Sequence, residues 1–121
     1  MDNYKLFDAE YKFMKLIWEN EPINSTELVK RCNENLGWKK STTYTVLRKL
    51  CDRGMLKNEN ATVTSVTKRE EAQKYESEAL LDKAFEGSLP KFLTAFLGGK
   101  KITNSEAEAL KRIIDESRGG K

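Results

Sequence analysis

The chain has 121 residues, a formal net charge of +3 and no histidine, a length that suits one ordinary domain or a small domain with an appendage. Its two cysteines, Cys32 and Cys51, lie far apart, so neither a zinc site of the usual spacing nor a cysteine–histidine nucleophile pair can be assembled, and we expect no metal and no cofactor. No stretch reaches the roughly 20 apolar residues of a membrane span, and the first residues carry acids where a signal peptide is apolar, so we expect a cytoplasmic protein.

Three short helices are predicted before residue 54. Apolar side chains recur at helical spacing over about residues 8–20, 25–36 and 41–52, and Pro22, Gly37 and Gly54 end the three segments. Asp8 is the expected N-cap of the first helix, and Asn24 or Ser25 that of the second. The inward-facing residues are predicted to be Phe13, Met14, Ile17 and Trp18, then Leu28, Val29 and Cys32, and finally Val46, Leu47 and Leu50.

A β-hairpin is predicted after the third helix. The turn Asn58–Asn60 is followed by the β-branched run TVTSV over residues 62–66. Three helices followed by a two-stranded ribbon make a winged helix-turn-helix domain, which we place at residues 1–67. In that arrangement the third helix lies in the major groove of DNA and the wing leans on the backbone.

The positive charge of the chain is concentrated on this third helix. Residues 38–57 hold six basic side chains and one acid, a local balance of +5, whereas residues 1–37 balance to −2 and residues 58–121 to 0. A basic cluster is usually only a solvated face, so charge alone would favour that reading. Its position on a recognition helix instead favours DNA as the partner.

The outward side of this helix supplies the candidate DNA-binding residues. Thr42, Tyr44 and Thr45 are the expected readers of base edges, and Arg48 can bind either guanine or a phosphate. The alternative, that the hydroxyl residues are neutral filler, is disfavoured because the run STTY lowers helix propensity. The complete set is Lys39, Lys40, Ser41, Thr42, Tyr44, Thr45, Arg48 and Lys49, with the lysines and Ser41 assigned to the phosphate backbone.

Residues 68–121 are predicted to form a three-helix dimerisation domain. Capping boxes at Thr67–Glu70 and Thr103–Glu106, and an N-cap at Ser88, start helices near residues 68, 89 and 104. Their apolar stripes need a partner surface, and we expect a second copy of the chain; the alternative is that they fold back on the winged helix as one core. The candidate interface residues are Leu80, Ala84, Phe85, Leu89, Phe92, Leu93, Phe96, Leu97, Leu110, Ile113 and Ile114.

Four stretches together resemble the penicillinase-repressor family, which includes methicillin-resistance and copper-responsive repressors. They are LFDAEYKFMKLIWENEPINSTELV, TTYTVLRKLCDRGML, REEAQKYESEALLDKAFEGSLPKFLTAFL and TNSEAEALKRIIDE, and they span nearly all of residues 6–116. The resemblance implies a mostly helical, cytoplasmic transcriptional repressor with a winged helix and a helical dimerisation domain. It implies a homodimer bound to palindromic double-stranded DNA operators, including those of antibiotic-resistance genes.

The family's modes of release are only partly matched. In its β-lactam-responsive members, a membrane-bound sensor system leads to cleavage of an asparagine–phenylalanine bond. In this chain Ala95 precedes the matching Phe96. The resemblance therefore implies Ala95–Phe96 as the candidate cleavage site and a sensor protease as a further partner. The paired cysteines of the copper-responsive members are missing from the tail SRGGK, which argues against metal control. The wing segment NENATVTSV has no arginine or aromatic residue, so we expect weak wing contacts with the DNA backbone.

The sequence fits two other classes of function less well. A winged helix with a helical tail can be a protein-interaction module that binds DNA weakly and without sequence preference. An enzyme is not expected, because the carboxylates are scattered over predicted solvated faces and no histidine is available for acid–base work.

Overall fold

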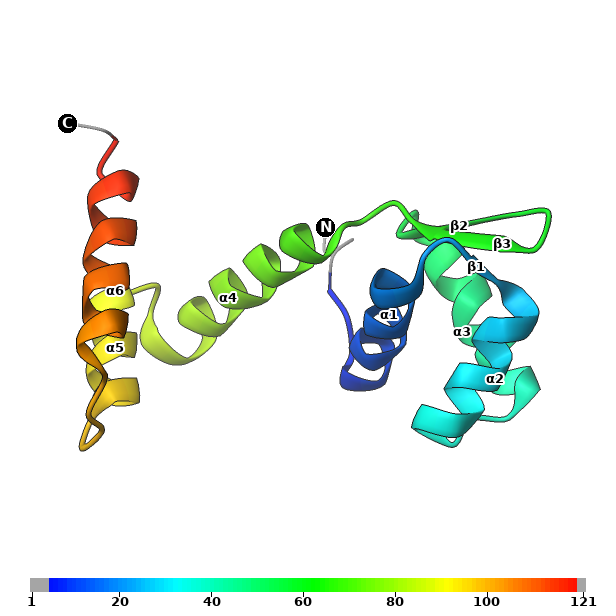
Figure 1. Ribbon diagram of the computed structural model, residues 1–121, viewed down its shortest axis with the longest axis horizontal. Helices are drawn as coiled ribbons and strands as arrows, with labels where there is room; N and C mark the ends of the chain where they lie inside the picture. Colours follow the sequence, from blue (N-terminus) through cyan, green and yellow to red (C-terminus); the bar gives the residue numbers. More distant parts are fainter. Residues whose placement is uncertain (1–4, 120–121) are drawn as a thin grey trace. The chain divides into compact units, whose positions relative to one another are not determined.

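Residues 5–119, which the computed structural model describes, form six helices and three short strands (Figure 1). The elements are α1 Asp8–Asn20, β1 Ile23–Asn24, α2 Ser25–Leu36, α3 Lys40–Asp52, β2 Leu56–Glu59, β3 Thr62–Ser65, α4 Arg69–Phe85, α5 Leu89–Leu97 and α6 Asn104–Ser117. Contacts divide the chain into two compact units, the first ending at Leu80 and the second beginning at Leu81. The predicted fold class, mostly helical with a small β wing, is confirmed.

The first unit has one hydrophobic core to which all three of its leading helices contribute. Phe13, Met14 and Ile17 of α1 are fully buried, as predicted, and Trp38 stacks on Phe13 with ring centroids 5.6 Å apart. Trp18, expected to point inward, is only half-buried. The buried residues that α2 and α3 add to this core include Leu28, Cys32, Leu47 and Leu50.

Helix α3 buries Leu47 and Leu50, as predicted, and adds Thr43, which was not expected in the core. Val46, the third residue expected to face inward, is half-buried and packs against the core. The hydroxyl of Thr43 donates to the carbonyl oxygen of Lys39 at 3.2 Å, so this polar group is satisfied inside the helix itself. Because Thr43, Leu47 and Leu50 are three or four residues apart, they form one stripe against the core.

Local signals set the helix ends. Asn24 caps α2, its side chain accepting from the Thr26 N–H at 2.8 Å, and Gly37 ends the helix with a φ of +70°. Helix α1 differs slightly from expectation: Asp8 is its first residue rather than its N-cap. The Glu10 carboxylate instead accepts from the Phe7 N–H at 3.0 Å.

The wing belongs to a three-stranded antiparallel sheet with the order β1-β3-β2, rather than the two-stranded ribbon that was predicted. Ile23 pairs with Val63 and Leu56 with Ser65. Strand β1 was missed because two residues are too short to show a period. The turn is Asn60–Ala61, both with positive φ, so it falls later than the predicted Asn58–Asn60.

Helix α4 starts at Arg69, one residue later than predicted. Thr67 is buried, and the Lys68 N–H donates to the Glu71 carboxylate at 2.8 Å before the helix begins at Arg69. Ala72, in the first turn that follows, is fully buried in the core of the first unit.

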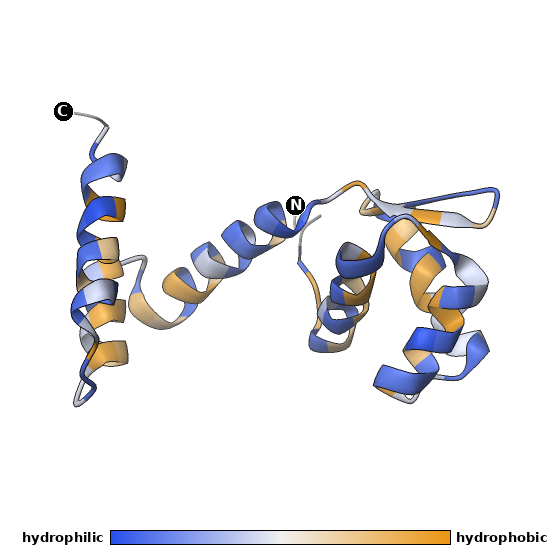
Figure 2. Ribbon diagram, viewed as in Figure 1, coloured by the Kyte–Doolittle hydropathy of each residue, from blue (hydrophilic) through white to orange (hydrophobic). Residues whose placement is uncertain are grey.

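The second unit keeps the predicted helix starts, and its apolar side chains are exposed or half-buried. The Ser88 hydroxyl accepts from the Lys91 N–H at 3.1 Å, and Thr103 and Glu106 form the predicted capping box. No residue of α5 or α6 is fully buried within the part of the chain that the structure describes, and Figure 2 shows α5 as a largely apolar helix. None of the helices between residues 5 and 119 is both long enough and apolar enough to span a membrane.

Candidate nucleic-acid interface

The candidate interface is the solvent face of α3 (Figure 1). Since the buried stripe occupies the opposite side of the helix, the residues between its members point outward. The exposed set contains seven of the eight predicted DNA-binding residues: Lys39, Lys40, Ser41, Thr42, Thr45, Arg48 and Lys49. Hydroxyl groups and cations therefore share one accessible face of a single helix.

Tyr44, the eighth predicted residue, was expected on that face but is half-buried. Its side chain packs against the core and donates its hydroxyl hydrogen to the Ser25 hydroxyl of α2 at 3.4 Å. Position 44 follows the buried Thr43 and precedes Leu47 by three residues, so it lies at the edge of the inward stripe. The contact ties α3 to α2.

The six cations of the basic segment separate into two groups. Within residues 5–119, no ion pair involves Lys39, Lys40, Arg48 or Lys49. Arg53 instead pairs with Glu10 at 3.2 Å and donates to the carbonyl oxygen of Lys5, and Lys57 lies 3.7 Å from Glu59. We refer to Lys39, Lys40, Arg48 and Lys49 as the free α3 cations.

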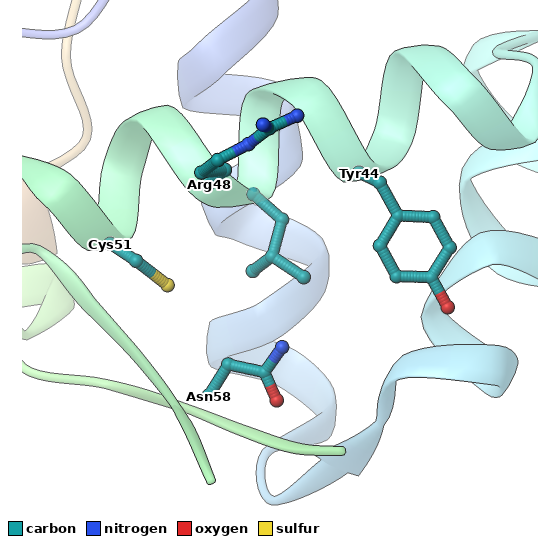
Figure 3. A pocket seen from close by; sticks show the side chains of 5 residues that line it. Tyr44, Arg48, Cys51 and Asn58 are labelled. Carbon is teal, nitrogen blue, oxygen red and sulfur yellow. The ribbon is translucent and has the colours of Figure 1, made fainter.

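A shallow depression separates α3 from the wing (Figure 3). It has a volume of about 430 Å³ and is lined by Tyr44, Leu47, Arg48 and Cys51 of α3 and by Asn58 of β2. The sequence did not point to Asn58 or Cys51, because a four-residue strand with mostly exposed residues gives no signal for the side that faces the helix. Asn58 and Arg48, which both carry hydrogen-bonding groups, line the same depression.

The two thiols are poorly suited to chemistry. Burial raises the pKa of the Cys51 thiol, and the neighbouring Asp52 carboxylate raises it further. Burial also raises the pKa of Cys32, and a hydrogen bond with Thr43 offsets only part of that effect. Both groups therefore favour the neutral form. The described residues also contain no group of three or more His, Cys, Asp or Glu side chains that could hold a metal ion.

Helix α3 has the dimensions of a DNA-reading helix. Its 13 residues span about 20 Å at a rise of about 1.5 Å per residue, and the major groove, about 12 Å wide, accepts one such helix. Hydroxyl and guanidinium groups can bond to base edges, while ammonium groups attract phosphates.

The predicted dimerisation residues lie on α4, α5 and α6, and many are accessible. The exposed fractions are 48% for Leu80, 50% for Leu89, 53% for Phe96, 57% for Ile113 and 49% for Ile114. Ala84 is also exposed, and the remaining members, Phe85, Phe92, Leu93, Leu97 and Leu110, are half-buried. Ala95, which is not a member of this set, is exposed as well. Phe92 contacts Phe85 edge-on at 5.5 Å and stacks on Phe96 at 5.6 Å. Ala95 and Phe96, the candidate cleavage pair, are consecutive residues inside α5.

Three helices, a small antiparallel sheet and a hairpin that follows the third helix define a winged helix-turn-helix protein. The sequence profile of the family described as "Penicillinase repressor" matches residues 6–116, so the chain belongs to the penicillinase repressor family, a family of transcriptional repressors. It is similar to the penicillinase repressor of Bacillus licheniformis, with 26% identity over 121 residues that cover 97% of this chain and 94% of that protein. The resemblance seen in the sequence is thereby confirmed. Transcriptional repressors are not a class of enzymes.

Proposed function

We propose that the protein is a homodimeric repressor that binds palindromic DNA operators, with α3 of each subunit in one major groove. The observation that carries this proposal is the exposed face of α3, on which the four free α3 cations accompany Ser41, Thr42 and Thr45. These cations make no ion pair with any residue between 5 and 119, which suits a polyanion, because none of the described ion pairs has to be broken when phosphate approaches.

Within this proposal the side chains divide between base reading and backbone positioning. Thr42 and Thr45 offer a hydroxyl for hydrogen bonds and a methyl group for the thymine C5-methyl, and Arg48 offers a fork for guanine. Lys39, Lys40, Lys49 and Ser41 are assigned to phosphates at the start and side of the helix. Tyr44 contributes mainly by holding α3 against α2 through Ser25.

Dimerisation is assigned to residues 68–121, with the apolar residues of α4, α5 and α6 as the surface. Their exposure in the single chain supports this assignment, since a monomer rarely presents a large apolar patch to water. Two subunits related by a two-fold axis would present two recognition helices to the two halves of a palindrome.

Release of the operator is assigned to proteolysis between Ala95 and Phe96 by a companion sensor protease. Both residues are exposed on α5, and a cut there would divide the dimerisation segment. The name of the Bacillus licheniformis relative points to genes of the β-lactamase type as those under control. Incubation with a membrane fraction from β-lactam-treated cells of the source strain should produce fragments ending at Ala95. Intact protein under conditions that induce the regulated genes would exclude this route.

The test of DNA recognition is selection of bound sites from random duplex DNA by the full-length protein. A two-fold symmetric winner, bound at least about a thousandfold better than a scrambled duplex, is the expected result. No enrichment, with equal and steeply salt-dependent binding to both duplexes, would contradict the proposal and favour the protein-interaction module.

Matched variants separate the assigned roles. Thr45→Ala and Arg48→Ala should each lower discrimination between sites by about 1–3 kcal/mol per lost base contact, whereas Lys39→Ala should weaken all duplexes alike. Lys12→Ala is the control, because Lys12 is an exposed lysine of α1 outside the candidate interface. Site preference that survives both Thr45→Ala and Arg48→Ala would remove these residues from base reading.

A further inference from the structure

Three backbone groups of the connection between β3 and α4 are hydrogen-bonded to the rest of the winged helix. The N–H groups of Val66 and Thr67 both donate to the carbonyl oxygen of Met55, at 2.8 and 3.1 Å. The carbonyl oxygen of Thr67 accepts from the Trp18 indole N–H of α1 at 2.9 Å. A connection of three residues that is bonded in this way has little freedom to change its path.

The carboxylate of Glu21, the residue after α1, binds Ser65, the last residue of β3 before the connection begins. It accepts from the Ser65 N–H at 2.7 Å and from the Ser65 hydroxyl at 2.8 Å, and the Lys68 ammonium lies 3.9 Å away. Lys68 in turn donates to the carbonyl oxygen of Ser65 at 2.7 Å. Since Ser65 is only 5% exposed, its N–H would lose its partner in a buried site if the carboxylate were removed.

The first turn of α4 is also packed against α1. The Arg69 guanidinium lies 5.7 Å from the centroid of the Trp18 ring and 3.6 Å from the Glu19 carboxylate. Ala72 is fully buried. We call Trp18, Glu21, Ser65, Lys68 and Arg69 the exit clamp, because together they fix where α4 leaves the winged helix.

The position of this exit matters for a dimeric DNA-binding protein. Helix α4 is continuous from Arg69 to Phe85, and therefore carries the chain from the first compact unit into the second. In a dimer held together by the second unit, the separation of the two α3 helices depends on how rigidly α4 leaves each winged helix. Each base pair added between half-sites moves the second half-site by about 3.4 Å and turns it by about 35°.

We propose that Glu21 and Arg69 act as positioning residues that restrict the dimer to operators with one spacing between half-sites. The exit clamp fixes the direction of α4 relative to α1 and the sheet. When base pairs are inserted or deleted, the second half-site moves along the duplex and turns around it, and the second recognition helix then no longer reaches it. This proposal rests on the proposed function, because it needs a dimer on a two-part site.

The experiment is a spacing series with the full-length protein. Operators derived from the selected site, with one or two base pairs inserted or deleted between the halves, are compared with the parent operator by affinity measurements. Wild-type affinity should fall by about 100-fold or more for the two-base-pair changes, because simultaneous engagement of both halves is lost. Glu21→Gln, which removes the charge of the carboxylate, should reduce that fall to about tenfold or less.

Glu70→Gln is the matched control, since Glu70 is an exposed glutamate at the start of the same helix and lies outside the exit clamp. The readout is the ratio of two affinities measured with one protein preparation, so a lower active fraction or lower stability does not change it. Arg69→Ala provides a second variant in case Glu21→Gln does not fold, because Arg69 makes only partly exposed contacts; it should also widen the tolerated spacing.

The outcomes separate the two proposals. If the affinity of the wild-type protein falls steeply when the spacing changes, and falls as steeply in Glu21→Gln and Arg69→Ala, the exit clamp is overturned and the repressor proposal stands. If Glu21→Gln does not fold, the result for Arg69→Ala alone decides. Failure of the wild-type protein to select a two-part site would overturn both.

Discussion

The salt dependence of operator binding follows directly from the pairing of the α3 cations. Three of the four free α3 cations, Lys39, Lys40 and Lys49, are assigned to phosphate, so a dimer would bring about six such cations to the DNA backbone. Each phosphate neutralised contributes about −0.9 to the slope of log affinity against log salt concentration, which gives a slope near −5. Lys39→Ala removes one contact per subunit and should bring the slope to about −4.

Fluorescence anisotropy with a labelled operator between about 50 and 200 mM salt measures this slope. Over that range, wild-type affinity should fall by about 10³-fold and that of Lys39→Ala by about 10²-fold. Arg53→Ala is an informative control: Arg53 belongs to the same basic segment but is already paired with Glu10, so its loss should leave the slope unchanged. An unchanged slope in Lys39→Ala would refute the assignment of Lys39, Lys40 and Lys49 to phosphate. A slope that is reduced as much in Arg53→Ala as in Lys39→Ala would refute it too.

Three further outcomes are expected. Replacing Phe92 and Phe96 together with Ser should give monomers in sedimentation and a sharp loss of operator affinity, and a persistent dimer would move the interface away from α5. Leu28→Ala should lower the free energy of unfolding by about 2–5 kcal/mol in urea denaturation, since Leu28 is fully buried; a loss under about 1 kcal/mol would mean that the core collapses around the cavity. Burial raises the pKa of Cys32 and Cys51 in the folded state. The contribution of the two thiols to stability is therefore complete below the pKa of the unfolded thiol and is lost as pH rises through the folded pKa. We expect the free energy of unfolding to fall above roughly pH 8.5. Iodoacetamide should correspondingly alkylate native Cys51 more slowly than the urea-unfolded chain at pH 8, and equal rates would contradict the effect of burial.

Features that depend on neighbours in the sequence were predicted well. The N-cap at Asn24, the end of α2 at Gly37 and the capping box of α6 all rest on residues within one turn of each other. Hydrophobic spacing likewise located the buried residues of α1, because a 3.6-residue period places Phe13, Met14 and Ile17 on one side whatever they pack against. These signals were sufficient for the order of the helices and the hairpin and for the winged-helix class, but not for the two-residue strand β1.

The sequence by itself therefore determined the helices, the hairpin and the concentration of charge on α3, since each follows from short-range periodicity and capping. Only the tertiary structure decided which charges remain available, because the partner of Arg53 is a glutamate 43 residues earlier in the chain. It also decided that Thr43 is buried and Tyr44 half-buried, and that Ile23–Asn24 completes the sheet by pairing with β3. Such pairings are chosen by complementary surfaces of elements far apart in sequence, and no local pattern encodes them.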